Sequence, residues 1–275
     1  MGMFALRRLV ALAALVAAAT AGAAAAAPLA AQIPQWRAVL LAAPNDSSPA
    51  RIRISHRGPV TVDRALPAVA AGLSPHAIRF AQNPAAGHTV VWADVVFEGR
   101  DEHTVSVLYD FGPGSQTPRV TTHDWDIYGY QKRTVKGQAV YVTSDPAYYT
   151  RPDVRSTVVM PILVLAYRSG AFVDVTSPNP QLITTELATY RSGFQPGVCQ
   201  TDDAMAAYLA DMVRLGQTQR GVADVTRMLK PSSDAQFFDT MNAALHAKKL
   251  VPKTQRLGIV PGIPRCDPNK QRPGT

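Results

Sequence analysis

Hydrophobic residues fall in short runs over the first two-thirds of the chain and recur at helical spacing over the last third. The clearest short runs lie in residues 160–176, MPILVLAYRSGAFVDVT, where two segments rich in β-branched residues flank Arg168, Ser169 and Gly170. This pattern predicts a β-hairpin in which the glycine takes the left-handed turn position. The unbroken apolar run 162–166 further predicts a strand that is covered on both faces and central to a sheet.

More strands are predicted on the N-terminal side of this hairpin. Residues 88–97 and 103–111 are apolar segments separated by a polar, glycine-containing turn, and 103–111 alternates as a half-buried antiparallel strand would. Shorter candidate strands are found at 119–122, 128–135 and 138–143 and, less regularly, within 51–62. The spacing of Trp36, Val39 and Leu40 instead predicts a short helix within 32–44. The sequence therefore predicts six or seven antiparallel strands before residue 177.

After residue 176 the hydrophobic pattern is helical. Four amphipathic segments are predicted, and Thr201 and Ser233 are candidate N-caps, the latter through a capping box with Gln236. The predicted fold class is α+β, an antiparallel sheet core followed by a C-terminal bundle of about four helices. The corresponding regions are a β-rich domain, 28–176, and a helical region, 177–275, that ends in an irregular basic tail.

Residues 1–27 have the three-part layout of a secretory signal peptide: Arg7 and Arg8, an apolar run, and a stretch of small residues. Cleavage near Ala26 or Ala31 is expected, and the protein is predicted to be periplasmic or secreted, with no transmembrane span after signal removal. An uncleaved N-terminal anchor is the alternative, although alanine is only weakly lipophilic. Export places the two cysteines in an oxidising compartment, so a Cys199–Cys266 disulfide around the helical region is predicted.

The net charge of +8 becomes about +6 when Arg7 and Arg8 leave with the signal. The basic residues are dispersed, with the densest groups around 51–57, 132–133 and 248–256. No nucleic-acid-binding motif accompanies them, so nucleic acid is not an expected partner. A modest basic excess on an exported chain is compatible with weak attraction to anionic envelope surfaces, but dispersed, solvated charge is the preferred interpretation. The expected partner is an unidentified protein or envelope component.

A family resemblance rests on four segments: residues 91–94 (VWAD), 123–125 (HDW), Gly129 with Tyr130, and 167–176. Together they resemble exported bacterial proteins of unknown function that carry FG-GAP or VCBS-like repeats. The resemblance implies an acidic, calcium-binding loop after a small apolar strand. This chain keeps Asp94 but continues with Val95 and Val96, and the second loop is likewise poor in carboxylates. Because calcium requires six to eight oxygen ligands, neither a metal site nor a cofactor is predicted.

The most site-like polar cluster is formed by His123, Asp124 and Asp126. These residue types hold metals or perform acid–base chemistry. On a strand, however, residues 123 and 125 face opposite to 124 and 126, so a polar loop around a buried Trp125 is the preferred interpretation and a functional cluster is the alternative.

Hydrolase motifs such as G-x-S-x-G and H-E-x-x-H are absent from the sequence. The leading interpretation is therefore an exported, non-catalytic binding or envelope-associated protein. The alternative is a periplasmic or secreted hydrolase with its active site near His123–Asp126.

Overall fold

The computed structural model describes residues 29–41, 50–66, 73–80, 87–97, 103–145, 148, 160–195 and 197–270. The segment predicted to be a signal peptide, 1–27, lies outside these residues. Strands and helices both occur, in separate parts of the chain, which confirms the α+β class. The expected number of strands was wrong, because the described residues form twelve strands in three sheets rather than one core of six or seven.

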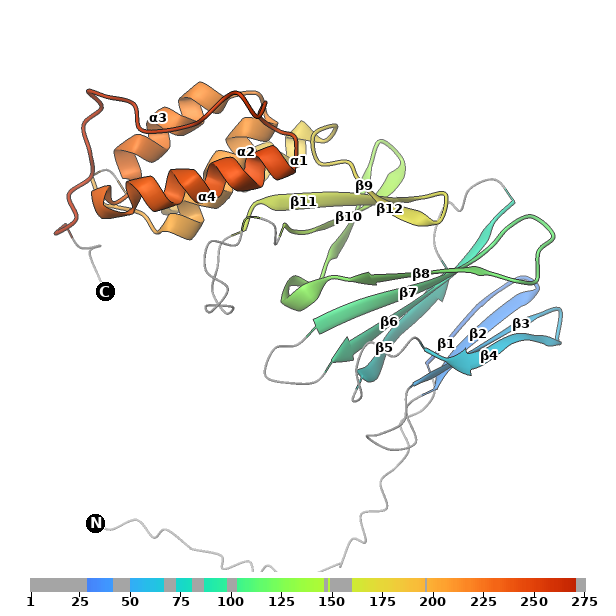
Figure 1. Ribbon diagram of the computed structural model, residues 1–275. Helices are drawn as coiled ribbons and strands as arrows, with labels where there is room; N and C mark the ends of the chain where they lie inside the picture. Colours follow the sequence, from blue (N-terminus) through green and yellow to red (C-terminus); the bar gives the residue numbers. More distant parts are fainter. Residues whose placement is uncertain are drawn as a thin grey trace, which may run out of the picture.

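Each sheet is an antiparallel meander of four consecutive strands (Figure 1). The first sheet contains β1 (Leu29–Ile33), β2 (Trp36–Leu41), β3 (Arg51–His56) and β4 (Val60–Ala65). The second contains β5 (Leu73–Phe80), β6 (Thr89–Phe97), β7 (His103–Phe111) and β8 (Arg119–Asp124). A short 3-10 helix, η1 (Asp126–Tyr128), leads to the third, which contains β9 (Gln131–Val135), β10 (Gln138–Ser144), β11 (Ile162–Arg168) and β12 (Ala171–Asp174).

The sheets and helices are stacked as layers in chain order. One hydrophobic core joins the first sheet to the second, another joins the second to the third, and a third core joins the third sheet to the helices. Alternate residues of a strand serve different cores: on β7, Val107 and Tyr109 face the first sheet, whereas Leu108 faces the third. β7 is therefore buried along most of its length and not half-buried as its alternation suggested.

The helix expected within 32–44 is wrong, because this segment forms β1, a turn and β2. Ala38 and Leu40 are fully buried against the second sheet, and Val39, between them, lies on the opposite face. Trp36, Val39 and Leu40 fit one turn of a helix equally well in the sequence, so the neighbouring sheet decides the structure.

The predicted hairpin at 160–176 is confirmed as β11 and β12, and Ile162–Ala166 is covered on both faces as expected. Ser169 and Gly170 both have positive φ, 49° and 81°, as a two-residue hairpin turn of type I′ requires. A side chain at Gly170 would also collide with Arg119 of β8, whose guanidinium donates to the Ser169 carbonyl. The tip of the hairpin thus packs directly on the second sheet.

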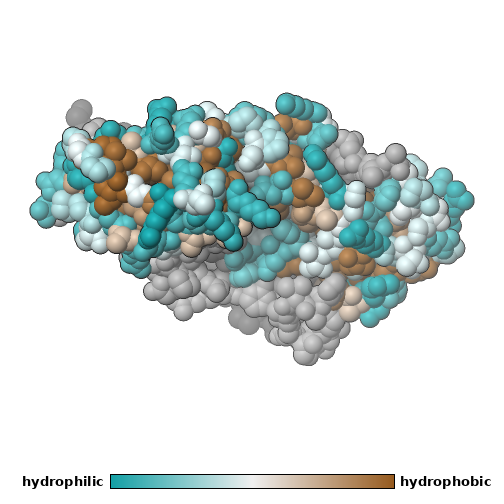
Figure 2. Space-filling model, turned by 45° about the horizontal axis from the view of Figure 1, so that its top comes forward, coloured by the Kyte–Doolittle hydropathy of each residue, from teal (hydrophilic) through white to brown (hydrophobic). Residues whose placement is uncertain are grey.

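Four α-helices follow, as predicted: α1 (Pro180–Gly193), α2 (Asp202–Arg214), α3 (Thr218–Met228) and α4 (Asp234–Ala247). Thr201 caps α2, accepting a hydrogen bond from the Ala204 N–H, whereas the side chain of Ser233 makes no capping bond. Hydrophobic side chains on the face shown in Figure 2 form small groups separated by hydrophilic ones, as expected of a surface exposed to water.

The predicted disulfide is confirmed, with the sulfur atoms of Cys199 and Cys266 2.07 Å apart. It fastens the C-terminal tail to the segment between α1 and α2, where a short parallel bridge pairs Val198 with Asp267. The disulfide is consistent with an oxidising, extracytoplasmic compartment. None of the helices in the described parts of the chain is long and apolar enough to cross a membrane.

Candidate ligand-binding cleft

The predicted polar cluster is divided in the structure. His123 lies on β8 and packs its imidazole against Trp125 and Phe172, with ring centroids 4.3 and 4.5 Å away. Burial among these rings lowers the pKa of His123, although the charge of Asp124 acts in the opposite direction. His123 is therefore part of an aromatic cluster between the second and third sheets.

Asp124 and Asp126 lie beside a different histidine. Their carboxylates are 3.8 and 3.7 Å from the two ring nitrogens of His103 on β7, and Asp124 also accepts the backbone N–H of Asp126 at 2.8 Å. Both aspartates are about half exposed. In the described part of the chain, no three metal-ligating side chains come together as a metal site would require. His123, Asp124 and Asp126 thus do not converge on one cavity.

The most extensive polar network in the aromatic cluster centres on Asp94 of β6, which is 3% exposed. One carboxylate oxygen accepts the Trp92 indole N–H at 2.6 Å and the Ser106 hydroxyl. The other accepts the Tyr130 hydroxyl at 2.7 Å and the Arg79 guanidinium at 2.5 Å. A buried carboxylate is stable only when it is paired and hydrogen-bonded, and Asp94 meets both conditions.

Arg79 and Tyr130 have fixed protonation states in this network. Burial alone would lower the pKa of Arg79, but the adjacent Asp94 carboxylate outweighs it and the pKa is raised. Burial, and then the charge of Asp94, raises the pKa of Tyr130. The guanidinium therefore stays charged and the phenol stays neutral. Arg79 also lies over the face of Trp92, 4.7 Å from its ring centroid, which adds a cation–π contact.

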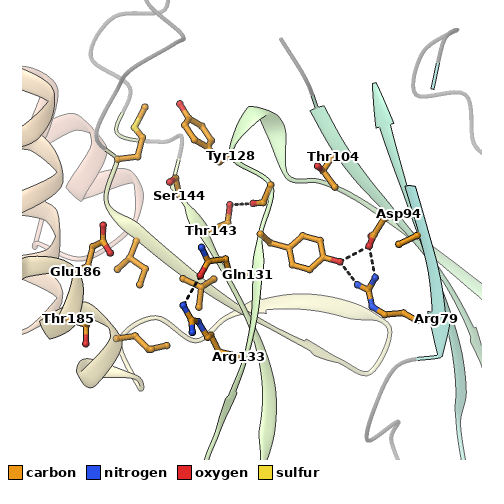
Figure 3. A pocket seen from close by; sticks show the side chains of 17 residues that line it. Arg79, Asp94, Thr104, Tyr128, Gln131, Arg133, Thr143, Ser144, Thr185 and Glu186 are labelled. Carbon is orange, nitrogen blue, oxygen red and sulfur yellow. Dashed lines mark hydrogen bonds and ion pairs between the residues drawn. The ribbon is translucent and has the colours of Figure 1, made fainter. Parts of the chain in front are cut away.

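A cleft of about 970 Å³ opens next to this network, between the second sheet, β9 and β10 of the third sheet, and α1 (Figure 3). The described residues that line it are Ala77, Arg79, Asp94, Thr104, Tyr128, Gly129, Tyr130, Gln131, Arg133, Val142, Thr143, Ser144, Met160, Ile162, Leu182, Thr185 and Glu186. Arg79 and Asp94 lie on the side of the cleft formed by the second sheet, and Thr185 and Glu186 lie on the side formed by α1.

Opposite charges stand on two walls of the cleft, formed by β9 and α1. Gln131 and Arg133 point from β9 toward the cleft, and Thr185 and Glu186 reach toward it from α1 (Figure 3). The Gln131 side-chain carbonyl accepts a hydrogen bond from the Arg133 guanidinium at 2.7 Å. Among the described residues, no carboxylate forms an ion pair with Arg133. The cleft thus offers one guanidinium whose charge is not already neutralised.

The floor of the cleft is apolar, and hydrogen bonds from α1 and α2 hold its backbone in place. Ile162 and Met160 are buried in it, and their backbone carbonyls accept hydrogen bonds from Arg214 of α2 and from Tyr190 of α1, the latter at 2.8 Å. Arg214 is itself paired with Asp145 at 2.7 Å. Because these bonds come from the helical layer, the helices fix the position of the cleft floor.

Few side chains in the cleft are available for nucleophilic catalysis. Nucleophilic catalysis by a hydroxyl such as Ser144 requires an adjacent general base. None of the described lining residues is a histidine or a cysteine, and the Asp94 carboxylate already accepts four hydrogen bonds. What remains is a set of hydroxyl and amide groups, one cation and one carboxylate above an apolar floor.

Sequence reasoning missed this cleft because its lining comes from six strands and two helices that are far apart in the sequence. Asp94 alone had a local signal: a carboxylate in the apolar run 89–97 needs buried partners. Comparison of the chain with protein-family models, with curated proteins and with solved structures finds no match. The resemblance to FG-GAP or VCBS-like proteins therefore stays a prediction, and the cleft is interpreted from its own geometry.

Proposed function

We propose that this chain is an exported, non-catalytic binding protein that holds a small polar organic anion in the cleft. The cleft itself carries the proposal, since its volume is in the range that encloses a small molecule, roughly 300–1,000 Å³. Its apolar floor and few convergent polar groups have the composition typical of ligand sites.

The opposed walls suggest how such a ligand lies. Arg133 presents a planar guanidinium that suits a carboxylate or phosphate group. Glu186, on the opposite wall, accepts hydrogen bonds from hydroxyl or amino groups. Val142, Ile162 and Leu182 between them contact the apolar part of the molecule. The ligand class that matches is an organic acid with hydrogen-bond donors at its other end.

The test uses the oxidised chain without residues 1–27 and a panel of hydroxy and amino acids, sugar acids and sugar phosphates, each acid paired with its neutral amide. Binding is followed by isothermal calorimetry and by tryptophan fluorescence, because Trp92 contacts Arg79, which lines the cleft. Acids are expected to bind and their amides to bind weakly. Arg133→Gln should weaken binding of the acids about tenfold or more.

Arg220→Gln is the matched control, because Arg220 is an exposed arginine on α3, away from the cleft lining. It should leave binding unchanged. Glu186→Gln should weaken only ligands that carry an amino or hydroxyl group at the far end. If no panel member binds, or if acids and amides bind equally and Arg133→Gln has no effect, the proposal is wrong.

The hydrolase alternative receives no support from the position of His123. Its ring packs between Trp125 and Phe172, and the nearby carboxylates face His103. His123→Ala should therefore have no catalytic phenotype in a screen with chromogenic esters and phosphoesters. Hydrolysis by the unaltered protein that His123→Ala abolishes would restore the alternative.

A further inference from the structure

Positive charge is concentrated in the first layer of the molecule. Residues 29–66 contain five arginines and two aspartates, whereas residues 67–275 contain 21 basic and 18 acidic residues. Half of the net charge of residues 29–275 therefore lies in the segment that forms the first sheet. Its location at one end of the layered stack, opposite the helices, makes the molecule electrostatically asymmetric (Figure 1).

Three of these arginines share the outer face of the first sheet. Ala38, Leu40, Ile52 and Ile54 are buried against the second sheet, and the residues that alternate with them point outward. Arg37 on β2 and Arg51 and Arg53 on β3 are exposed on this outer face. In the register of the two strands Arg53 lies opposite Val39, so Arg37 is its diagonal neighbour.

Asp63 on β4 holds two of the guanidinium groups in place. Its carboxylate accepts a hydrogen bond from Arg51 at 2.9 Å and two from Arg53, at 3.0 and 2.8 Å. Hydrogen bonds from Arg51 and then from Arg53 lower the pKa of Asp63, so the carboxylate stays charged. One carboxylate cannot neutralise two arginines, and the side chains of Arg51 and Arg53 remain 48% and 51% exposed. No carboxylate among the described residues pairs with Arg37.

The surroundings of the arginines fit an interfacial role. Val39 and Leu41 lie half-buried on the same outer face, and Val60, at the start of β4, is 53% exposed. The first sheet begins at Leu29, directly after the segment predicted to be a signal peptide or anchor. If residues 1–27 remain as an anchor, the first sheet is the layer connected directly to it.

We propose that the outer face of the first sheet docks onto anionic phospholipid headgroups of the cell envelope, through Arg37, Arg51 and Arg53. Arginine matches a phosphate with two parallel hydrogen bonds, and Asp63 orients two arginines before the surface is met. Each basic residue close to an anionic leaflet contributes a small, salt-sensitive attraction. This contact is weak and reversible, and it leaves the cleft, on the other side of the second sheet, accessible. It does not depend on the proposed ligand.

Vesicle sedimentation tests the proposal with the oxidised chain lacking residues 1–27. Binding is compared for vesicles of phosphatidylcholine with 40% phosphatidylglycerol and for pure phosphatidylcholine, at low and high salt. The protein should sediment with the anionic vesicles only, and high salt should release it. Removing two arginines with Arg37→Gln and Arg53→Gln should weaken binding roughly 25-fold, at about fivefold per charge.

Two further variants separate this face from general charge and from misfolding. Lys249→Gln with Lys253→Gln removes the same charge at the helical end and should leave binding unchanged. Asp63→Asn removes the negative charge beneath Arg51 and Arg53, so it should tighten binding about fivefold, an increase that a folding defect would not produce.

Equal binding to neutral and anionic vesicles would overturn the proposal, and so would an equal loss in the lysine control. Retention on immobilised polyglutamate without any vesicle binding would also overturn it, assigning the face to an acidic protein instead.

Discussion

The interfaces on the two sides of the third sheet are both built around a buried carboxylate and an arginine, but they satisfy the carboxylate differently. Toward the second sheet, Asp94 accepts bonds from four side chains, three of them neutral. Toward the helices, Arg214 pairs with Asp145 at 2.7 Å and with Asp211 at 3.4 Å. Lys248 reaches the same Asp145 at 3.0 Å.

The difference is clearest at Asp211. Its side chain is fully buried, and one of its carboxylate oxygens has no hydrogen-bond partner among the described residues. Burial raises the pKa of Asp211 to about 7, although the charge of Arg214 acts against this. The two interfaces contain the same pair of residue types, but their stability depends differently on the charge of the carboxylate. In the part of the chain that the structure describes, Asp94 has four hydrogen-bond donors, whereas Asp211 has one cationic partner, Arg214.

The largest expected effect is that of Arg214→Met. It leaves Asp211 buried without its cationic partner, removes one of the two cations at Asp145 and frees the Ile162 carbonyl. Breaking a buried ion pair on one side typically costs about 3–5 kcal/mol, and denaturant unfolding followed by circular dichroism measures it. Arg220→Met, on the exposed face of α3, should stay within about 0.5 kcal/mol. A similar small loss for Arg214→Met would show that the helical interface does not depend on this arginine.

Asp211 should give the helical interface a pH dependence. The folded protein retains a proton on this group up to about pH 7, whereas the unfolded chain releases it near its usual pKa of 3.8. Between these values the free energy of unfolding falls as the pH rises, by up to about 4 kcal/mol from this group, and it is constant above the window.

Asp211→Asn is the variant that isolates this contribution. The unfolding free energy of the unaltered protein minus that of the variant should be smaller at pH 8 than at pH 4. A difference independent of pH would show that Asp211 does not titrate in that range. A rise with pH would show that its pKa is lowered and not raised.

Arg79→Met should have the smallest effect of the three. Asp94 keeps its bonds from Trp92, Ser106 and Tyr130, and Arg79 is 30% exposed, so a loss of about 1–2 kcal/mol is expected. Loss of the cation–π contact should also change the tryptophan emission. Arg168→Met, an exposed arginine on β11, serves as the control. A loss as large as that of Arg214→Met would show that Asp94 depends on its arginine equally.

The parts of the fold that were predictable from the sequence are those decided by local pattern. The hairpin at 162–174 follows from two apolar runs and a turn, and the helices follow from their spacing. β2 was missed because Trp36, Val39 and Leu40 fit a helix as well as a strand, and only the second sheet resolves this. The number of sheets was missed for the same reason, since pairing partners are not local.

The candidate site, unlike the hairpin and the helices, could not be predicted from local sequence. His123, Asp124 and Asp126 are adjacent in sequence, yet strand geometry directs them to different surroundings. Arg133 and Glu186, which face the same cleft, are more than fifty residues apart, and neither lies in a recognisable motif. Closeness in sequence was therefore a poor guide to the functional surface.

The meander arrangement has a consequence for how the protein acquires its structure. Every strand pair within the three sheets joins consecutive strands, so the pairings are local in the sequence, which favours rapid folding. Since the layers also follow chain order, a chain emerging N-terminus first can complete each sheet before the next arrives. The cystine joins residues 199 and 266 within the last layer alone. We therefore expect the three sheets to assemble without the disulfide and the helical layer alone to depend on oxidation.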